Sequence, residues 1–573
     1  MESKRIAKSV VKALPYTALV AAMVLAGCGG SDDAEGGPVM RDAAACTALP
    51  TLTGITNAPS IASATWVAAG TAKASASATD FLPAHCVVKG SMAPHTGVDG
   101  VAYAIKFELR LPQDWNGRFF FQGGGGLEGT LPAAYGSTGG PKTALEQGFA
   151  VVSQNGGHDN ALLSNAQAFG LDPQARIDFG YASVEKTART AQNVLAKYYG
   201  HAADKSYFDG CSTGGRQGMS FAQRFPDVFD GIVAGAPVFD FARHIAGQIW
   251  SLQHVAAIVP KGVDGQPQYY KAMSTSDKKL FQTALLTACD AQDGVADGMV
   301  SDFLHCGFKP ETLQCTGAKN DGCLSSDQIG VLKAVMSGPL TSSGTPFKSP
   351  GYKTVGEFVV PGYRVDPGWM APSGQSTRLF GTETALPGDF GLGVYPTPYL
   401  HMTPPQPAFN PITDVNWDTW GATMTVDAPW LMADPDISAF RKRKGKILFY
   451  HGTGDPGPNI VNTINYYEQM AALNGGVAET TQFARLFMVP AMGHCGSGPS
   501  TDSFDRLKPM VDWVEQGIAP DAILASARAG NTDLNGVTPA IPPNRTRPLC
   551  PYPKHAQYKG SGSVDDAANF ACQ

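Results

Sequence analysis

The sequence predicts an α/β fold in which a mostly parallel, doubly wound sheet carries a large inserted domain. Apolar runs typical of strands alternate with amphipathic helical patterns early in the chain and again near its end. This alternation is typical of parallel sheets covered by helices. The expected strands are residues 101–111, 118–122, 150–153, 207–209, 231–235, 446–450 and 485–489, and the expected helices are residues 183–199, 460–474 and 502–517.

Residues 239–433 interrupt the alternation. This segment is rich in Gly, Pro, Trp and Tyr, contains four cysteines and has little regular hydrophobic period. A long disordered insert is the alternative, but such segments are poor in aromatic residues. We therefore expect a lid domain at residues 239–433, inserted between two parts of one α/β domain at residues 46–238 and 434–573.

The N-terminus is expected to direct export. Four basic residues precede an apolar run within residues 1–27, and Leu-Ala-Gly then leads into Cys28. This pattern is similar to a bacterial lipobox, which predicts cleavage before Cys28, a lipid anchor on that cysteine and an outer-membrane, periplasmic or extracellular location. An ordinary signal peptide or a short anchor is the alternative. The glycine-rich residues 28–45 are expected to form a flexible tether.

Composition excludes some partners. The net charge is −6 and no basic patch interleaved with aromatic residues is present, so we expect no nucleic-acid partner. With 43% hydrophobic and 16% charged residues, the chain can build a deep core and an additional domain. We expect a monomer.

The most informative motif is Gly-Cys-Ser-Thr-Gly at residues 210–214. A nucleophilic serine at a sharp turn from strand to helix needs strained backbone angles and small neighbours two residues away on each side. The preceding apolar run and the following helical pattern provide the strand and the helix. The motif predicts Ser212 as a nucleophile.

A catalytic acid and a catalytic base follow in the chain order of α/β-hydrolases, namely Ser, then Asp, then His. Asp455 and His494 each lie on a loop directly after an expected strand. His494 would take the proton of Ser212, while Asp455 would fix the imidazole tautomer and stabilise the imidazolium. His451 precedes the acid and is not expected to be the base. The sequence thus predicts the α/β-hydrolase fold.

An oxyanion hole needs two backbone N–H donors. One is expected from Thr213, directly after the nucleophile, and the other from Gly126, the last residue of the four-glycine loop 123–126. A phosphate-binding loop is the alternative, but no Gly-Lys-Ser/Thr follows.

These motifs resemble the tannase and feruloyl esterase family. The similarity covers nearly all of the chain after the expected leader, and its most specific parts are residues 210–215, 451–455, 493–495 and 547–553. The resemblance implies a serine carboxylesterase that acts on small esters of aromatic acids of the feruloyl, galloyl or terephthaloyl type.

Ten cysteines remain after Cys28, and an even number in an oxidising compartment predicts five disulfides. Their pairing does not follow from the sequence alone. The family resemblance implies the pairs Cys46–Cys86, Cys211–Cys495, Cys289–Cys306, Cys315–Cys323 and Cys550–Cys572.

An acidic loop in the expected lid places three carboxylates within eight residues. Taken alone, it is equally an acidic turn or a Ca²⁺ loop, and its spacing is not that of an EF-hand. The resemblance implies a structural Ca²⁺ and no organic cofactor. The implied ligands are the side chains of Asp290, Asp293 and Asp297 and the carbonyls of Val295 and Met299.

The substrate pocket is the least determined part. Four lid aromatics are candidates for it, although core packing is the usual role of any single one: Trp369, Phe380, Phe390 and Tyr395. Family members that hydrolyse terephthalate monoesters hold the free carboxylate with an arginine four residues before a phenylalanine.

If that phenylalanine corresponds to Phe390, this chain has Leu386 at the arginine position. Arg378 or Arg364 would have to substitute. We therefore expect neutral or phenolic aromatic esters to be preferred to esters that carry a carboxylate. The fold alone also allows a peptidase or a lipase, and the alternative from another class is a non-catalytic surface lipoprotein that binds polyphenols or carbohydrates.

Overall fold

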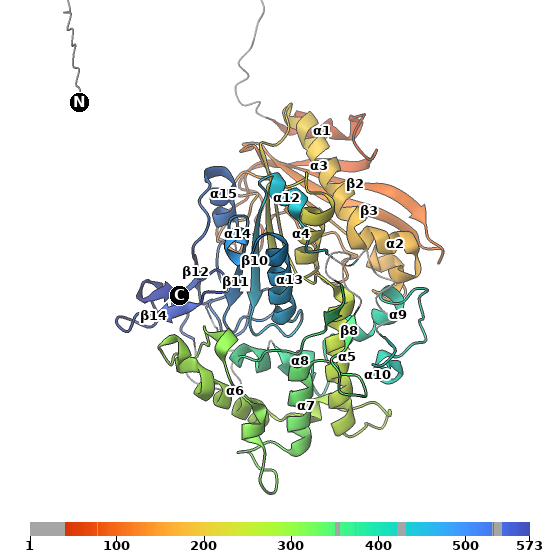
Figure 1. The fold of residues 1–573 in the computed structure, drawn as a ribbon. Coiled ribbons are helices and arrows are strands. Elements are labelled where there is room, and N and C mark those ends of the chain that lie inside the picture. Colours follow the sequence, from red (N-terminus) through yellow and green to blue (C-terminus); the bar gives the residue numbers. More distant parts are fainter. Residues whose placement is uncertain are drawn as a thin grey trace, which may run out of the picture. The chain divides into compact units, whose positions relative to one another are not determined.

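A nine-stranded sheet organises the protein in the computed structural model, which describes residues 41–573 except 77, 350–355, 373, 421–430, 432, 530 and 532–540 (Figure 1). The strand order is β1-β2-β3-β5-β4-β6-β7-β10-β11. Pairing is antiparallel from β1 to β5 and parallel from β5 to β11. The strands are β1 (Ser60–Val67), β2 (His85–Thr96), β3 (Ala102–Pro112), β4 (Arg118–Gln122), β5 (Ala150–Gln154), β6 (Lys205–Cys211), β7 (Gly231–Gly235), β10 (Lys446–Gly452) and β11 (Ala484–Val489).

Helices cover both faces of the parallel half, as the doubly wound fold requires. Phe119 and Phe121 of β4 point into a core shared with α3 and α13, whereas Phe120 between them points into a core shared with α15. This alternation follows from the period of two along a strand. The helices of this domain are α1 (Ala43–Thr47), α2 (Pro173–Ile177), α3 (Ser183–Tyr199), α4 (Thr213–Arg224), α12 (Ser438–Lys442), α13 (Ile460–Leu473), α14 (Val477–Thr480) and α15 (Leu507–Gln516).

The strand and helix predictions are confirmed for every expected element, with shifts at their ends. The largest shift is in the last helix, which begins at Leu507 rather than at residue 502. Strands β1 and β2 at the antiparallel edge were not predicted. Strand β1 is rich in Ser, Ala and Thr and largely exposed, so it has no apolar alternation to reveal it.

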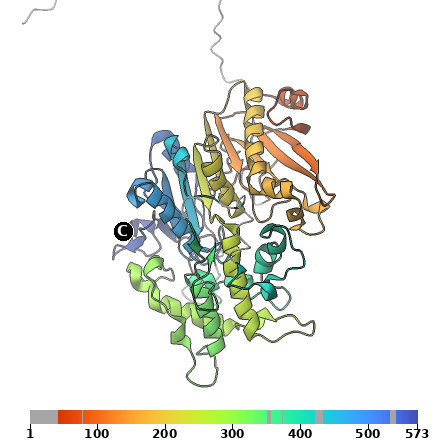
Figure 2. The ribbon, with the colours of Figure 1, turned by 45° about the vertical axis from the view of Figure 1, so that its right-hand side comes forward.

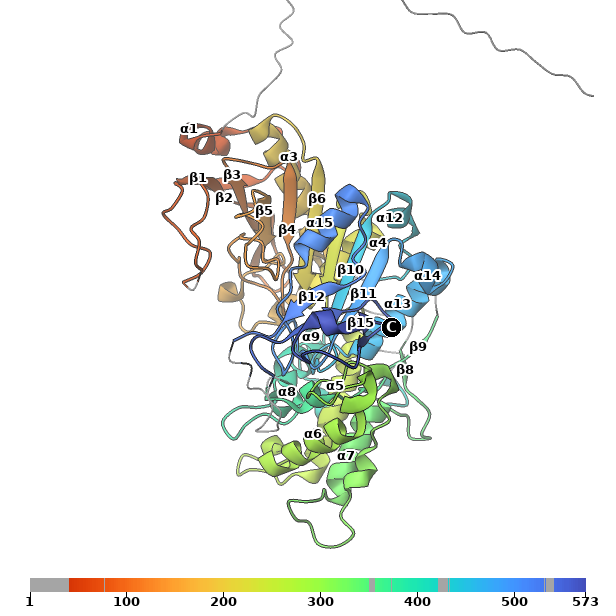
Figure 3. The ribbon, with the colours of Figure 1, turned by 90° about the vertical axis from the view of Figure 1, so that its left-hand side faces the viewer.

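The segment between β7 and β10 is more regular than the sequence indicates. Its helices gather beyond the carboxyl ends of the parallel strands (Figures 1, 2 and 3). Helix α5 buries consecutive residues from Phe241 to Ile249, and a helix buried on all sides shows no one-sided hydrophobic period. The elements are α5 (Phe241–Ile258), α6 (Thr275–Cys289), α7 (Ser326–Ser337), β8 (Lys348–Ser349), β9 (Phe358–Val359), α8 (Gln375–Arg378), α9 (Thr397–Leu400) and α10 (Pro411–Asp414).

The C-terminal residues form two small sheets, and disulfides join several elements. Strands β12 (Ile523–Ser526) and β13 (Thr546–Leu549) pair, as do β14 (Ala556–Tyr558) and β15 (Phe570–Cys572). All five disulfides implied by the family resemblance are present: Cys46–Cys86, Cys211–Cys495, Cys289–Cys306, Cys315–Cys323 and Cys550–Cys572.

The expected leader and Cys28 lie outside the described residues. Helix α1 begins at Ala43 and is capped by the side chain of Asp42, so the last residues of the expected tether are helical. In the described part of the chain, no helix is both long enough and apolar enough to span a bilayer.

Candidate active site

Ser212 lies at a strained turn between β6 and α4. Its φ is 64° and its ψ is −120°, a conformation that non-glycine residues rarely adopt. A Cβ on Gly210 would lie 2.8 Å from Gly214, and one on Gly214 would lie 2.7 Å from the carbonyl oxygen of Gly124. Glycine is therefore required on both sides of the serine, and the turn has the form of a nucleophile elbow.

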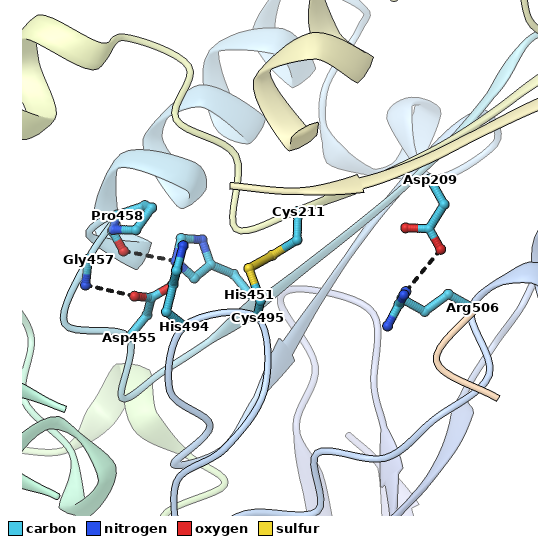
Figure 4. The surroundings of a disulfide bond; sticks show 9 residues. All are labelled: Asp209, Cys211, His451, Asp455, Gly457, Pro458, His494, Cys495 and Arg506. Atoms are coloured by element: carbon cyan, nitrogen blue, oxygen red, sulfur yellow. Dashed lines mark hydrogen bonds and ion pairs between the residues drawn. A yellow bond between two sulfur atoms is a disulfide. The ribbon is translucent and has the colours of Figure 1, made fainter. Parts of the chain in front are cut away.

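Asp455 and His494 form a hydrogen-bonded pair on neighbouring strand ends (Figure 4). The Nδ1 of His494 lies 2.8 Å from Oδ2 of Asp455, and the backbone N–H of Gly457 donates to Oδ1 at 2.7 Å. The carboxylate is buried, while the imidazole is partly exposed. Burial would raise the pKa of Asp455, but His494 and His451 hold it well below its usual range. The acid is thus ionised and able to orient the imidazole.

The disulfide Cys211–Cys495 joins the serine and histidine segments. Cys211 directly precedes Ser212 and Cys495 directly follows His494, and their Cα atoms are 6.0 Å apart. The structure thus pairs Asp455 with His494 and links the segment of His494 covalently to that of Ser212.

His451 is a contact of the acid that sequence reasoning did not identify. Its Nε2 lies 2.9 Å from the carbonyl oxygen of Pro458 and 3.2 Å from Oδ2 of Asp455, and its Nδ1 lies 2.8 Å from Oγ1 of Thr463. Because Nε2 faces two acceptors, this nitrogen carries the proton and Nδ1 accepts from the threonine hydroxyl. His451 thus donates to the acid from within the loop. Its i, i+4 spacing from Asp455 was the available signal.

The predicted oxyanion segments lie side by side. Oγ1 of Thr213 donates to the carbonyl oxygen of Gly126 at 2.7 Å, and the N–H of Gly124 donates to Gln217 in α4 at 2.9 Å. Gly126 has a φ of 57°, which favours glycine. The glycine loop is thereby fixed to the start of the helix that follows the nucleophile.

A buried carboxyl group that was not predicted lies beneath this loop. Glu128 accepts a hydrogen bond from Nε2 of Gln154 at 2.6 Å. Burial raises the pKa of Glu128 to about 7, although Gln217 and Arg216 act in the opposite direction. No motif marks this residue, because its environment comes from β5 and α4.

Arg378 from the lid lies beside the Asp455–His494 pair. A Cβ on Gly457 would lie 3.6 Å from Nη2 of Arg378 and 3.5 Å from Nδ1 of His494. The guanidinium also donates to Asp389 at 2.9 Å. Burial raises the pKa of Asp389 to about 6 against the influence of Arg378. The charge of Arg378 is therefore compensated by a buried partner.

Phe390 and Leu386 belong to an aromatic part of the lid. The Phe390 ring contacts those of Tyr269 and Tyr395, with centroids 5.5 Å and 5.6 Å away. Leu386 is 50% exposed and, together with Tyr269, lines a cavity of about 270 Å³. Leu392 reaches the glycine loop, 4.0 Å from where a Cβ on Gly126 would lie.

The other two aromatic candidates are buried in the lid core. Trp369 and Phe380 are both fully buried, which is the core-packing role that the sequence left open for them. Arg364, the second candidate substitute for the missing arginine, donates from Nη1 to the carbonyl of Leu304 at 2.5 Å.

The acidic loop folds around its own carboxylates. Asp290 accepts from the N–H of Gly298 at 2.9 Å, and Asp297 pairs with Arg547 of β13. Burial, then the neighbouring Asp297 and Asp290, raises the pKa of Asp293 to about 7. Within the described residues no group of acidic, His or Cys side chains forms a ready-made metal site.

A strained serine elbow and a hydrogen-bonded Asp–His pair at the carboxyl ends of parallel strands define the class of α/β-hydrolases. The chain belongs to the tannase and feruloyl esterase family, whose model matches residues 86–573. It is therefore a carboxylic ester hydrolase.

Individual relatives agree with this membership. The chain is 42% identical over 567 residues to a mono(2-hydroxyethyl) terephthalate hydrolase of Piscinibacter sakaiensis, covering 92% of this chain and 91% of that protein. It is 31% identical over 500 residues to a probable feruloyl esterase B-2 of Aspergillus terreus, covering 82% and 83%. The crystal structure of feruloyl esterase B from Aspergillus oryzae matches with a TM-score of 0.73 at 25% identity, covering 93% of this chain and 100% of that one.

Proposed function

We propose that this protein hydrolyses esters of aromatic acids through an acyl-enzyme formed on Ser212. The observation that carries the proposal is the His494–Asp455 hydrogen bond of 2.8 Å, attached through Cys211–Cys495 to the strained serine turn. Such an arrangement activates a hydroxyl that is otherwise a weak nucleophile.

The proposed reaction has two halves. His494 takes the proton of Ser212 as its oxygen attacks the ester carbonyl carbon, and Asp455 stabilises the resulting imidazolium. The backbone N–H groups of Thr213 and Gly126 stabilise the oxyanion. His494 then protonates the departing alcohol. A water molecule, deprotonated by the same histidine, releases the acid and restores the serine.

The acyl group is proposed to be aromatic and uncharged or phenolic. Relatives named as feruloyl esterases and as a terephthalate-ester hydrolase support the aromatic part, and Phe390 and Leu386 offer apolar contacts. Arg378 and Arg364 are both engaged with protein acceptors. Each guanidinium would therefore have to share its donors between a protein acceptor and a substrate carboxylate.

A structural Ca²⁺ is proposed in the acidic loop. Hard oxygen donors suit this ion. Burial and the charge of Asp297 raise the pKa values of both Asp290 and Asp293, and a bound cation would stabilise their ionised forms. Among the described residues, the carbonyls of Val295 and Met299 accept no hydrogen bond that would compete with a metal. Asp297 would have to share its carboxylate with Arg547.

Export with a lipid anchor on Cys28 is also proposed. The five disulfides support an oxidising compartment. We propose a monomer, because the expected substrate site uses residues of one chain.

The first prediction concerns Ser212→Ala. The purified protein is expected to hydrolyse methyl ferulate or methyl gallate, and the variant is expected to lose at least about 10⁴-fold in kcat, because the nucleophile is absent. Ser220→Ala, in the helix that follows Ser212, is the matched control and should remain active. Initial rates on these esters, mono(2-hydroxyethyl) terephthalate and p-nitrophenyl butyrate provide the measurement.

Three other outcomes would each reject a different part of the proposed function. Turnover of p-nitrophenyl butyrate alone would retain the triad and reject the aromatic acyl group. Turnover that persists in Ser212→Ala would reject the nucleophile. A lack of turnover with retained ligand binding would favour the non-catalytic binding protein.

A further inference from the structure

Asp366 is a fully buried carboxylate from the lid that contacts both loops of the proposed triad. It precedes the short 3₁₀-helix Pro367–Met370, and its Oδ1 accepts from the N–H of Trp369 at 3.1 Å. Its Oδ2 accepts from the hydroxyl of Thr453 and from the N–H of Ala491 at 3.0 Å. One lid side chain therefore bridges two loops that β10 and β11 supply separately.

The two loop contacts lie close to the proposed catalytic groups. Thr453 is two residues before Asp455, and Ala491 is three residues before His494. Oγ1 of Thr453 also accepts from the N–H of Ala491 at 2.8 Å. The carboxylate, the hydroxyl and the amide thus form a closed triangle between the acid loop and the base loop.

Backbone packing around this triangle leaves no free space. A Cβ on Gly368 would lie 2.2 Å from the carbonyl oxygen of Ala491, and one on Gly454 would lie 2.7 Å from the carbonyl carbon of Gly368. Ala491 has a φ of 56°, a strained value for a residue with a Cβ. The lid backbone, the acid loop and the base loop are therefore held against one another at this point.

The buried charge of Asp366 has no ionic partner. Among the described residues, no Lys, Arg or His lies within ion-pair distance of it, and burial raises its pKa to about 6. A buried carboxylate that is balanced only by hydrogen bonds is costly, and its two oxygens here accept from three donors, an arrangement that an acceptor-only group matches.

We propose that Asp366 is a positioning residue through which the docked lid sets the relative placement of Asp455 and His494. It touches no reacting atom and acts through Thr453 and Ala491. The inference rests on the triad of the proposed function. The proposal adds a role for the lid beyond enclosing the substrate: the lid would also hold the catalytic acid and base in place.

The test compares Asp366→Asn with Thr453→Val and Thr453→Ser. In Asp366→Asn, an amide N–H₂ group replaces one carboxylate oxygen and faces the O–H and N–H donors that this oxygen accepts from. Thr453→Val removes the bridging hydroxyl, whereas Thr453→Ser keeps it. Asp366→Asn and Thr453→Val are expected to lower kcat by about 10- to 100-fold, because small misplacements of catalytic groups have effects of this size. KM is expected to change by less than about threefold, and Thr453→Ser to keep most of the activity.

A control separates positioning from general stability. Asp172→Asn alters the same kind of Asp-Pro cap at the start of α2, whose side chain accepts from Ala175 at 2.8 Å, and removes the carboxylate that pairs with His95 at 3.1 Å. It is expected to lower Tm without lowering kcat. The second-order rate at which a fluorophosphonate inactivates the enzyme, which reports activation of Ser212 by His494, should fall in Asp366→Asn and not in Asp172→Asn.

The results distinguish this inference from the proposed function. If Ser212→Ala abolishes turnover while folded Asp366→Asn and Thr453→Val both keep kcat within about threefold of the parent, the positioning role is rejected and the triad stands. Equal losses in Thr453→Val and Thr453→Ser would also reject it. If Asp366→Asn does not fold, the Thr453 pair decides alone. Undiminished turnover in Ser212→Ala would reject the triad itself.

Discussion

Leu386 is the single residue from which the substrate preference can be tested most directly. If Phe390 corresponds to the family phenylalanine, Leu386 occupies the position expected for a carboxylate-binding arginine, and its side chain is half exposed at the lid cavity. We expect kcat/KM for the methyl ester of mono(2-hydroxyethyl) terephthalate to equal or exceed kcat/KM for the free acid.

The variant Leu386→Arg should raise kcat/KM for the acid by about tenfold, which is the gain that one charge-assisted hydrogen bond can provide. Leu386→Met is the neutral control. A preference of the parent enzyme for the acid by about 100-fold would refute the hypothesis.

At the level of residues, the candidates Ser212, Asp455 and His494 could be located from the sequence, but the contacts that surround them could not. Ser212, Asp455 and His494 each follow a recognisable strand in a fixed order, so local patterns locate them. His451 and Asp366 make contacts with Asp455, Thr453 and Ala491 that exist only after the loops and lid have assembled. Such contacts leave no period or spacing along the chain, apart from the i, i+4 relation of His451 to the acid.

Among the connections between elements, the disulfide Cys211–Cys495 is the one expected to control activity. It links the end of β6 to the loop after β11 across 284 residues. In the double variant Cys211→Ala/Cys495→Ala, unfolding free energy should fall by about 2–4 kcal/mol and kcat should fall with it, because serine and histidine lose a shared restraint. Tm and kcat are measured together.

The lid disulfide provides the comparison. Cys315–Cys323 closes a loop of only 8 residues, so its removal should cost less stability and should leave kcat unchanged. Full activity in the Cys211/Cys495 variant would contradict the proposed restraint. The sequence reveals a helix with one buried face, and the bounds of α3 match the expected ones. It does not reveal α5, whose first half is buried on every side.

At the scale of the whole molecule, the acidic loop connects the lid to the C-terminal strands. Asp297 pairs with Arg547, and its carbonyl accepts from Nη1 of Arg545 at 2.6 Å. A cation bound by Asp290, Asp293 and Asp297 would therefore stabilise two distant parts of the chain at once. Neither arginine contact could be predicted, since about 250 residues separate the partners.

Removal of Ca²⁺ is expected to lower stability more than it lowers the intrinsic catalytic rate. An ion that binds only the folded state adds about 2.7 kcal/mol when its concentration is about 100 times its Kd. Tm should therefore be higher in CaCl₂ than in EDTA, while kcat of the folded enzyme at low temperature should change little. Asp293→Asn should abolish the difference, because it removes a ligand without touching Arg547, and Asp327→Asn on α7 should preserve it. The same Tm in EDTA and in CaCl₂ would instead identify the loop as an acidic turn held by its arginine and backbone contacts.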